Sequence, residues 1–236
     1  MLVIRDLVKS YGSGPRAVDG LSLSVEAGDI YGFIGHNGAG KTTTLRCVAG
    51  ILPFQEGEIT VDGLSIREKP LEAKRIMRYI PDNPDLYGFL TGIGYLNFLC
   101  DIYGIDAATR SARIAKYAAL FEIESKLGDL VSSYSHGMCQ KLALIGALVQ
   151  QPKLLMLDEP FVGLDPKAAH TLKTIMHELV ESGSAIFFST HVLEVAEKLC
   201  NKIAIIKNGK LVASGPMDAV RGDQTLEELF LELTDA

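Results

Sequence analysis

The sequence predicts a mixed α/β protein with an antiparallel β subdomain and an inserted α-helical lobe. Three observations predict this fold class. Short β-rich runs fill the first part of the chain, helical periodicity without a convincing strand occupies residues 85–150, and strand–helix alternation resumes at Lys153. We therefore expect residues 1–84 and 151–236 to form the core with the β subdomain, and residues 85–150 to form a helical subdomain.

The first part of the chain carries several short strand signals. Runs rich in apolar or β-branched residues predict strands at residues 2–7, 17–25, 29–34, 57–61 and 78–80. The turn pair Asp62-Gly63 ends the fourth of these runs, and Pro81 ends the fifth. A helix is expected over residues 71–77.

A glycine-rich loop stands between the predicted strand 29–34 and a predicted helix that begins near Lys41. It reads Gly35-His36-Asn37-Gly38-Ala39-Gly40-Lys41-Thr42 and fits the pattern G-x-x-x-x-G-K-[ST]. Such a loop points successive backbone N–H groups at phosphate oxygens, and the positive end of the helix dipole faces the same anion. We expect Lys41 to meet the β- and γ-phosphates and the Thr42 hydroxyl to bind Mg²⁺. The core is therefore predicted to be of the phosphate-loop NTPase type.

The rest of the chain divides into helices of the lobe and alternating elements of the core. Helices of the lobe are expected at 92–103, 107–121 and 137–150. In the core we expect strands at 154–157 and 185–189, helices at 166–181 and 192–199, and a hairpin of 202–207 with 210–214 across Asn208-Gly209.

The C-terminal tail has the pattern of an amphipathic helix. Leu226, Leu229, Phe230 and Leu233 follow the spacing i, i+3, i+4, i+7. We expect this apolar face to pack on its own domain, with a partner protein as the alternative.

Two acids end the apolar run 154–157. A parallel sheet places its functional groups at the carboxyl ends of its strands, so Asp158 and Glu159 are expected near the phosphate loop rather than as ordinary surface acids. Asp158 is predicted to orient Mg²⁺, and Glu159 to polarise the attacking water.

Bulk composition excludes several classes of protein. The net charge of −6 argues against a general nucleic-acid binder. No run of about 18 apolar residues is present, so no bilayer-spanning segment is expected. Four cysteines without metal-ligand spacing indicate reduced thiols in a cytosolic protein.

One further motif leads to a family. The segment before the helix 137–150 reads Tyr134-Ser135-His136-Gly137-Met138-Cys139-Gln140-Lys141. Together with the phosphate loop and the paired acids, in this order, it resembles the ATP-binding subunit of an ATP-binding cassette (ABC) transporter, over roughly residues 2–220. The family signature Leu-Ser-Gly-Gly-Gln keeps its serine and second glycine here, whereas His136 and Met138 depart from it.

The resemblance implies further site residues. Ser135 and Gly137 would hold the γ-phosphate bound to the opposite subunit, and His136 would bring a bulky ring beside it. His191 matches a histidine that contacts the γ-phosphate, so the implied catalytic residues are Glu159 and His191. The implied nucleotide contacts are Tyr11 (stacked on adenine), Gly35, Asn37, Gly38, Ala39, Gly40, Lys41, Thr42, Thr43, Ser135 and Gly137.

The resemblance also implies a set of metal ligands and a loop at the dimer interface. The implied metal ligands are Thr42, Asp158 and Asp82, the last of which stands where the family usually has glutamine. Gly163-Leu164-Asp165 matches a loop that crosses the dimer interface in the family, and this is compatible with a simple turn before Pro166.

The implied function is ATP hydrolysis, with ATP and Mg²⁺, by a subunit that pairs with a second ATP-binding subunit and drives a separate transmembrane subunit. Docking is expected near Tyr87, Phe89 and Leu90, on the inner face of the cell membrane. The alternatives are a soluble cassette ATPase of DNA repair or translation, a phosphate-loop kinase, and a nucleotide-binding regulatory module without turnover. Import or export, and homodimer or heterodimer, stay open.

Overall fold

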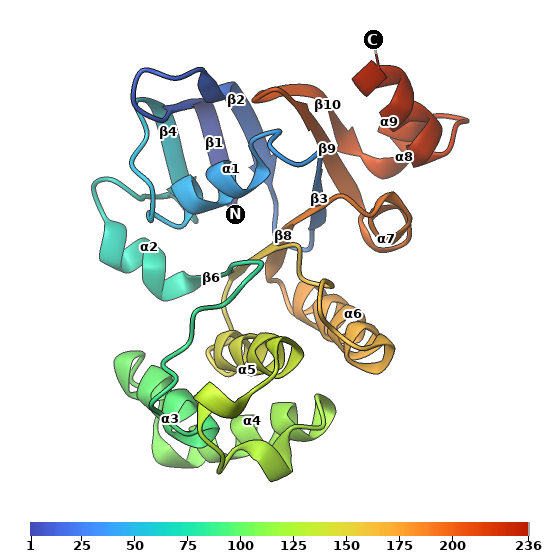
Figure 1. Cartoon of the computed structure of the whole chain (residues 1–236). Helices are drawn as coiled ribbons and strands as arrows, with labels where there is room; N and C mark the ends of the chain where they lie inside the picture. The colour runs from blue at the N-terminus through green and yellow to red at the C-terminus, as the bar shows by residue number, and fades with distance from the viewer. Residues whose placement is uncertain (236) are drawn as a thin grey trace.

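A computed structural model describes the backbone of residues 1–235 and the side chains of residues 1–233. Two β-sheets form the upper part of the molecule as drawn in Figure 1, and the helices α3, α4 and α5 form a lobe beneath them that packs on the larger sheet through α5. The fold class expected from the sequence, a mixed α/β core with a β subdomain and a helical lobe, is confirmed.

The strands and helices have the following bounds. The strands are β1 (Leu2–Ser10), β2 (Arg16–Val25), β3 (Ile30–Ile34), β4 (Glu56–Val61), β5 (Leu64–Ser65), β6 (Met77–Ile80), β7 (Leu154–Asp158), β8 (Ala185–Thr190), β9 (Lys202–Lys207) and β10 (Lys210–Pro216). The α-helices are α1 (Lys41–Val48), α2 (Pro70–Ile76), α3 (Gly92–Ile102), α4 (Ala107–Leu120), α5 (His136–Leu148), α6 (Pro166–Glu181), α7 (Leu193–Leu199), α8 (Met217–Arg221) and α9 (Leu226–Asp235). Short 3₁₀ turns occupy Glu124–Lys126 and Val131–Ser133.

The larger sheet has the strand order β10-β9-β3-β8-β7-β6. The pairs from β9 to β6 are parallel, and β10 is an antiparallel edge strand. Because parallel strands end at the same edge, the segments that follow β3, β6, β7 and β8 meet there although they are far apart in the sequence. This topology places the candidate site.

The smaller sheet is antiparallel, with the order β2-β1-β4-β5. It belongs to the same hydrophobic cluster as α1, which lies between the two sheets in Figure 1. Buried Leu45 and Val48 on α1 pack in this cluster with Phe33 of β3 and Leu2 of β1. The β subdomain therefore supports the helix that follows the phosphate loop.

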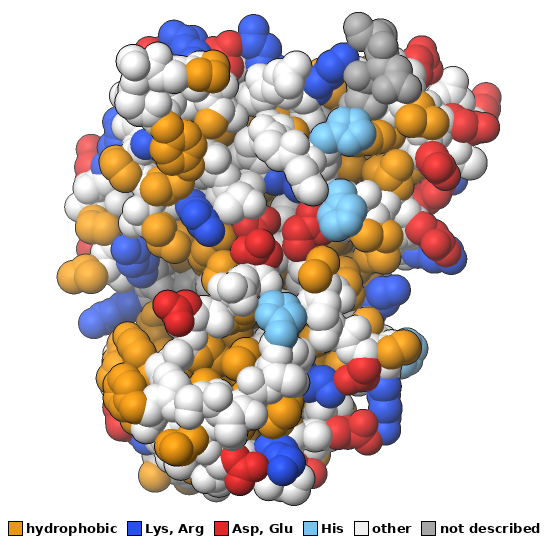
Figure 2. Space-filling view, viewed as in Figure 1, with side chains coloured by type: hydrophobic (Ala, Val, Ile, Leu, Met, Phe, Trp, Pro, Cys, Tyr) orange, Lys and Arg blue, Asp and Glu red, His pale blue; other side chains and the backbone are white. Residues whose placement is uncertain are grey.

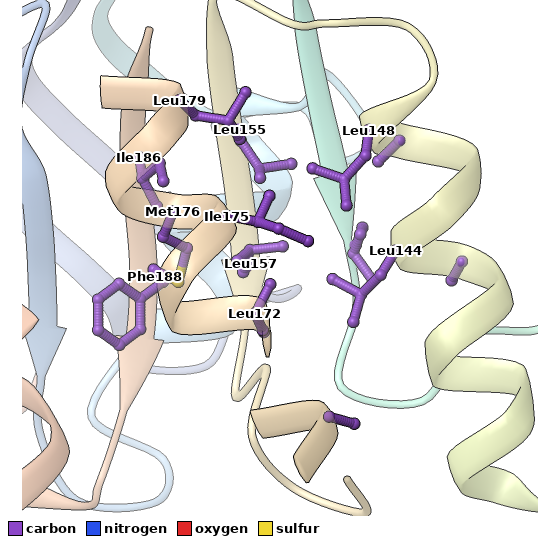
Figure 3. Close-up of a cluster of buried hydrophobic side chains, with 14 of the residues drawn as sticks. Leu144, Leu148, Leu155, Leu157, Leu172, Ile175, Met176, Leu179, Ile186 and Phe188 are labelled. Carbon is purple, nitrogen blue, oxygen red and sulfur yellow. The ribbon is translucent and has the colours of Figure 1, made fainter. Parts of the chain in front are cut away.

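The side chains of the central strands divide between two hydrophobic clusters, because successive residues of a strand point to opposite faces of the sheet. Leu154 and Met156 of β7 face the cluster under α1. Leu155 and Leu157 face the other cluster, among the leucines of α5 and α6, as Figure 3 shows. Both faces of the sheet are thus covered, which explains why these strands are continuous apolar runs rather than alternating ones.

The helices of the lobe begin where side-chain caps satisfy their first N–H groups. Thr91 accepts from Gly94 N at 3.1 Å, and Asp106 accepts from Thr109 N at 2.9 Å. Ser135 accepts from Met138 N at 3.3 Å and so caps α5. The three expected helices of residues 85–150 are present, each within about two residues of its predicted bounds.

The remaining predictions from periodicity are also confirmed, with two omissions. The tail is helical as α9, and Leu226 and Phe230 are 0% and 6% exposed in the core cluster of their own chain, so the expected packing on the chain's own domain is correct. Strand β5 and helix α8 are present in the structure but are not predicted from the sequence. Both are short, and their periodicity is too brief to distinguish them from turns.

Candidate nucleotide site

The candidate site lies at the carboxyl edge of the parallel sheet. The phosphate loop follows β3, Asp82 follows β6, Glu159 follows β7, and His191 follows β8. Figure 2 shows acidic and histidine side chains gathered near the middle of the face that looks toward the viewer, between the core and the helical lobe. The residues predicted for the site follow different strands of the sheet, and the fold brings them close together in space.

The glycines of the phosphate loop are required by close contacts as well as by backbone conformation. A Cβ on Gly35 would lie 2.6 Å from the carbonyl oxygen of Ile206, and one on Gly40 would lie 2.4 Å from that of Ala17. Gly38 has φ +82° and open space where its Cβ would be. The loop is thus pressed against β9 and β2 on one side and open on the other, as a backbone cradle for an anion must be.

Lys41 is buried at the base of this cradle, only 6% exposed. Its amine donates to the carbonyl oxygens of Gly35 at 2.6 Å and His36 at 3.2 Å, and it lies 3.7 Å from Glu159 Oε1. The pKa of Lys41 is below its ordinary value because burial disfavours the ammonium, an effect that the charges of Glu159 and Asp158 oppose. A bound triphosphate would favour the ammonium further.

Asp158 is held by two hydroxyl groups. Ser189 Oγ donates to Asp158 Oδ1 at 2.5 Å, and Tyr79 donates to Oδ2 at 3.4 Å. Burial, and then the charge of Asp158, raise the pKa of Tyr79, so this hydroxyl stays protonated as a donor. At 1% exposed, Asp158 is oriented from within the sheet and is not an ordinary surface acid.

Glu159 occupies a strained backbone position beside His191. Its φ of +48° is uncommon for a residue with a side chain, and such strain clusters at functional sites. Glu159 Oε1 lies 3.0 Å from His191 Nδ1, and it is buried without a well-aligned hydrogen bond from the described residues. A buried carboxylate oxygen of this kind is suited to a water molecule.

A cavity of about 180 Å³ lies over the phosphate loop. Its lining brings together Lys41, Thr42, Asp82 and Glu159, so Asp82 does reach the site from β6. Within residues 1–233, no cluster of three or more His, Cys, Asp or Glu side chains is arranged to hold a metal ion. The hydroxyl of Thr42, one carboxylate and the oxygens of a triphosphate fit Mg²⁺, which is usually bound by few protein ligands together with phosphates and water.

Tyr11 lies next to the helix that follows the loop. Its hydroxyl is 3.2 Å from Thr43 Oγ1, and its ring is 53% exposed with Lys9 Nζ 5.2 Å from the ring centroid. The ring is therefore not packed into a strand end, and its open face is accessible to a base.

The segment Ser135–Gly137 lies at the start of α5, in the helical lobe. It contributes nothing to the described lining of the cavity over the phosphate loop. The ring of His136 lies against Gly163 of its own chain, where a Cβ would be 2.4 Å from His136 Cδ2. A Cβ on Gly137 would lie 2.7 Å from Gly163 O, so the glycine of this motif is also needed for packing.

A second contact ties α5 to the same loop. Lys141 Nζ and Asp165 Oδ2 are 2.6 Å apart, with Lys141 16% exposed, and this interaction lowers the pKa of Asp165. Asp165 also caps α6 by accepting from Ala168 N at 2.8 Å. The segments 135–137 and 163–165, which the resemblance assigns to the dimer interface, therefore form one connected surface.

Three residues of the site were missed by sequence reasoning. Ser189 and Tyr79 position Asp158, and His36 lines the cavity. A hydroxyl at the end of a predicted central strand is a usable signal for Ser189. The roles of Tyr79 and His36 depend on neighbours that only the folded chain brings close.

The fold and the site define an ATPase of the phosphate-loop class. A family model described as "ABC transporter" matches residues 18–162. The chain is 34% identical to the ABC-type transporter ATP-binding protein EcsA of Bacillus subtilis, with 99% of this chain and 96% of EcsA covered. The chain therefore belongs to the ABC transporter family, as an ATP-binding subunit that hydrolyses ATP with Mg²⁺ as cofactor.

Solved structures agree with this assignment. One described as an ATP-binding subunit of an ABC transporter superposes with a TM-score of 0.95 at 33% identity, with 99% of both chains covered. A dimeric ATP-binding cassette, MJ0796 bound to ADP and phosphate after hydrolysis, has a TM-score of 0.84 at 20% identity, over 92% of this chain and 99% of that one. The second comparison supports the fold alone.

These findings decide among the classes considered from the sequence. The transporter subunit and its ATPase activity are confirmed, and neither a DNA-repair or translation ATPase, nor a kinase, nor a module without turnover is favoured. Among the helices of residues 1–235, none has the length and apolar content needed to cross a membrane.

Proposed function

We propose that two copies of this chain, or this chain and a related one, close head to tail on two ATP molecules. The single observation that carries this proposal is the separation within one chain of the two halves of the site. Lys41, Glu159 and His191 converge on the phosphate loop, whereas Ser135 and Gly137 lie in the helical lobe and do not line the cavity. A second copy would supply them, in an arrangement supported by the dimeric form of MJ0796.

Each side chain has a distinct role in the proposed reaction. The backbone N–H groups of residues 37–40 and the Lys41 ammonium hold the phosphates, and the Tyr11 ring stacks on adenine. Glu159 orients the attacking water and accepts its proton, and His191 stabilises charge on the γ-phosphate. Thr42, Asp158 and Asp82 would hold Mg²⁺, which would supply positive charge to neutralise the charge developing on the phosphates.

From the opposite copy, the capped end of α5 completes the site. Ser135 Oγ accepts from Met138 N, and its hydroxyl hydrogen remains able to donate to a phosphate oxygen. The His136 ring packs on Gly163 of its own chain. The position of the segment 163–165 would therefore determine whether this ring also contacts the nucleotide bound to the opposite copy.

We propose that a transmembrane subunit docks between β6 and the helical lobe. A cavity of about 250 Å³ lies there, and its lining includes Tyr95 and Leu86. Beside it the rings of Tyr87 and Phe89 lie 5.8 Å apart, centroid to centroid, tilted by 36°. These residues are 49% and 77% exposed, an unusual amount of aromatic surface to leave in water. Figure 2 shows hydrophobic side chains gathered at the edge of this lobe.

This docking would hold the chain on the inner face of the membrane. Each of the two proposed domains would then have its own role. Residues 1–84 with 151–236 form the ATP-binding core, and residues 85–150 form the lobe that carries Ser135 to the opposite site. Closing and opening of the dimer would move the docked subunit.

The role of Glu159 is tested by Glu159→Gln, which keeps the size of the side chain and removes its basicity. ATP binding should survive, and turnover should fall by about 10²–10⁴, the usual scale for a lost general base. Unchanged hydrolysis would contradict the assigned role.

The composite site is tested by mixing two variants, Glu159→Gln and Ser135→Ala, each of which we expect to have lost most of its turnover. A mixed dimer holds one complete site, so an equimolar mixture should recover about one quarter of the wild-type sites. The matched control is a chain that carries both substitutions. Its dimer holds no complete site, so it should show no recovered activity. If mixing restores no activity and ATP never promotes association in sedimentation, the homodimer is wrong and a heterodimer takes its place.

A further inference from the structure

The C-terminal helix reaches the phosphate loop. The ring of Phe230 on α9 lies 4.8 Å from the ring of His36, centroid to centroid, at an interplanar angle of 63°. This edge-to-face geometry is the favourable one for aromatic pairs. The contact joins two segments that are nearly the whole chain apart in sequence.

Phe230 is buried in the core, whereas its neighbour His36 is exposed. Phe230 is 6% exposed, in the same core cluster as Leu226, Leu199 of α7 and Ile205 of β9. His36 is exposed at the rim of the cavity over the loop. A core residue of α9 therefore presents its ring to the exposed part of the phosphate loop.

The backbone of His36 is part of the phosphate cradle. Its carbonyl oxygen accepts from Lys41 Nζ at 3.2 Å and from Ala39 N at 3.1 Å. Moving the His36 peptide would therefore move an acceptor that sets where the Lys41 ammonium points. The floor of the loop is already fixed, because Gly35 and Gly40 leave no room against Ile206 and Ala17.

A second connection ties the same region together. Gly209 N donates to Ala39 O at 2.9 Å, so the β9–β10 turn holds the other side of the loop. Lys207, at the end of β9, approaches the carbonyl oxygen of Leu233 on α9 at 3.5 Å. The loop, the β9–β10 turn and α9 thus form one contiguous group of contacts.

We infer that Phe230 is a positioning residue for the phosphate loop: its ring supports His36, and the docked C-terminal helix thereby raises the affinity of the loop for nucleotide. The inference rests on ATP binding by this chain and does not depend on the proposed dimer. The competing explanation is that Phe230 only fills the core under α9.

A double-mutant cycle on Phe230 and His36 separates the two explanations. Binding of Mg·ADP is measured by calorimetry, because ADP avoids both turnover and ATP-driven association. Phe230→Ala should weaken binding by about two- to tenfold, the scale of an aromatic pair. His36→Ala should weaken it similarly, and adding Phe230→Ala to His36→Ala should change it by less than about twofold.

Phe230→Leu distinguishes ring support from core filling. Leucine restores most of the apolar volume, so thermal stability should recover relative to Phe230→Ala, while Mg·ADP binding should stay weakened. All variants are compared at a temperature where circular dichroism shows them folded. Wild-type affinity in Phe230→Leu, or equal effects of Phe230→Ala with and without the His36 ring, would overturn the inference.

Discussion

The contact between His136 of the signature segment and the loop at Gly163 gives a prediction that can be worked out from the structure. Gly163 has φ +79°, and a Cβ there would lie 2.4 Å from His136 Cδ2 and 2.8 Å from Nε2. Gly183 has φ +94° and nothing within 4 Å of its built Cβ. Replacing either glycine by alanine therefore has the same kind of backbone cost, that of a positive φ. Only the replacement at Gly163 also adds a steric clash, with the ring of His136.

The magnitudes follow from these two terms. A left-handed backbone costs an L residue about 1–2 kcal/mol, which both Gly163→Ala and Gly183→Ala incur. The exposed ring of His136 can turn aside at about 0.5–1.5 kcal/mol, the cost of leaving a rotamer. We expect the free energy of unfolding of Gly163→Ala to be lower than that of Gly183→Ala by this second amount. The melting temperature should then be lower by about 2–4 °C per kcal/mol.

The assay is urea unfolding of both variants with and without His136→Ala, since removal of the ring removes the collision. In the His136→Ala background the two glycine substitutions should destabilise the protein equally. An excess for Gly163→Ala that persists without the ring would refute the reasoning, and so would the absence of any excess when the ring is present.

Two further predictions concern the nucleotide and the thiols. Tyr11→Ala should weaken ATP binding by about 5- to 150-fold, which corresponds to the roughly 1–3 kcal/mol of base stacking. Tyr11→Phe keeps the ring and loses the contact with Thr43, so it should bind within about twofold of wild type. Equal binding by the two variants in calorimetry would exclude stacking on this ring. Burial raises the pKa of the Cys47 thiol to about 11 and raises that of Cys139 above its usual range, so thiolate is scarce at both. Cys139 is only partly buried, so iodoacetamide should label it first in the native protein, with Cys47 reacting on unfolding; mass spectrometry that finds Cys47 modified first would contradict this order.

Particular residues show how far the sequence could predict the site. The phosphate loop at 35–42 was identified from its spacing, because a tight backbone turn around phosphate needs glycine at fixed positions. Asp158 and Glu159 were identified because acids at the end of a buried strand stand out from its apolar run. The contacts of Ser189 and Tyr79 with Asp158 are not predictable in this way. A hydroxyl at the end of a strand can mark a site residue, as at Ser189, but it does not show which carboxylate it will meet.

The signature segment shows a second limit of prediction from sequence. The segment departs from the family at His136, and the resemblance implies that the ring of this residue lies beside the nucleotide of the opposite subunit. The structure places the ring on Gly163 of the same chain, a contact set by how α5 packs beside the segment 163–165. Such packing depends on the relative position of two segments, which no local pattern encodes.

By itself the sequence determined the order of the elements, the ligand class and most of the residues around it, because hydrophobic periodicity and short motifs are local properties of the chain. Tertiary structure decided which of these residues meet. The parallel sheet brings the ends of β3, β6, β7 and β8 to one edge, and packing of α9 brings Phe230 to the phosphate loop. The physical reason is that burial of apolar surface against both faces of one sheet fixes distances between residues that are far apart along the chain.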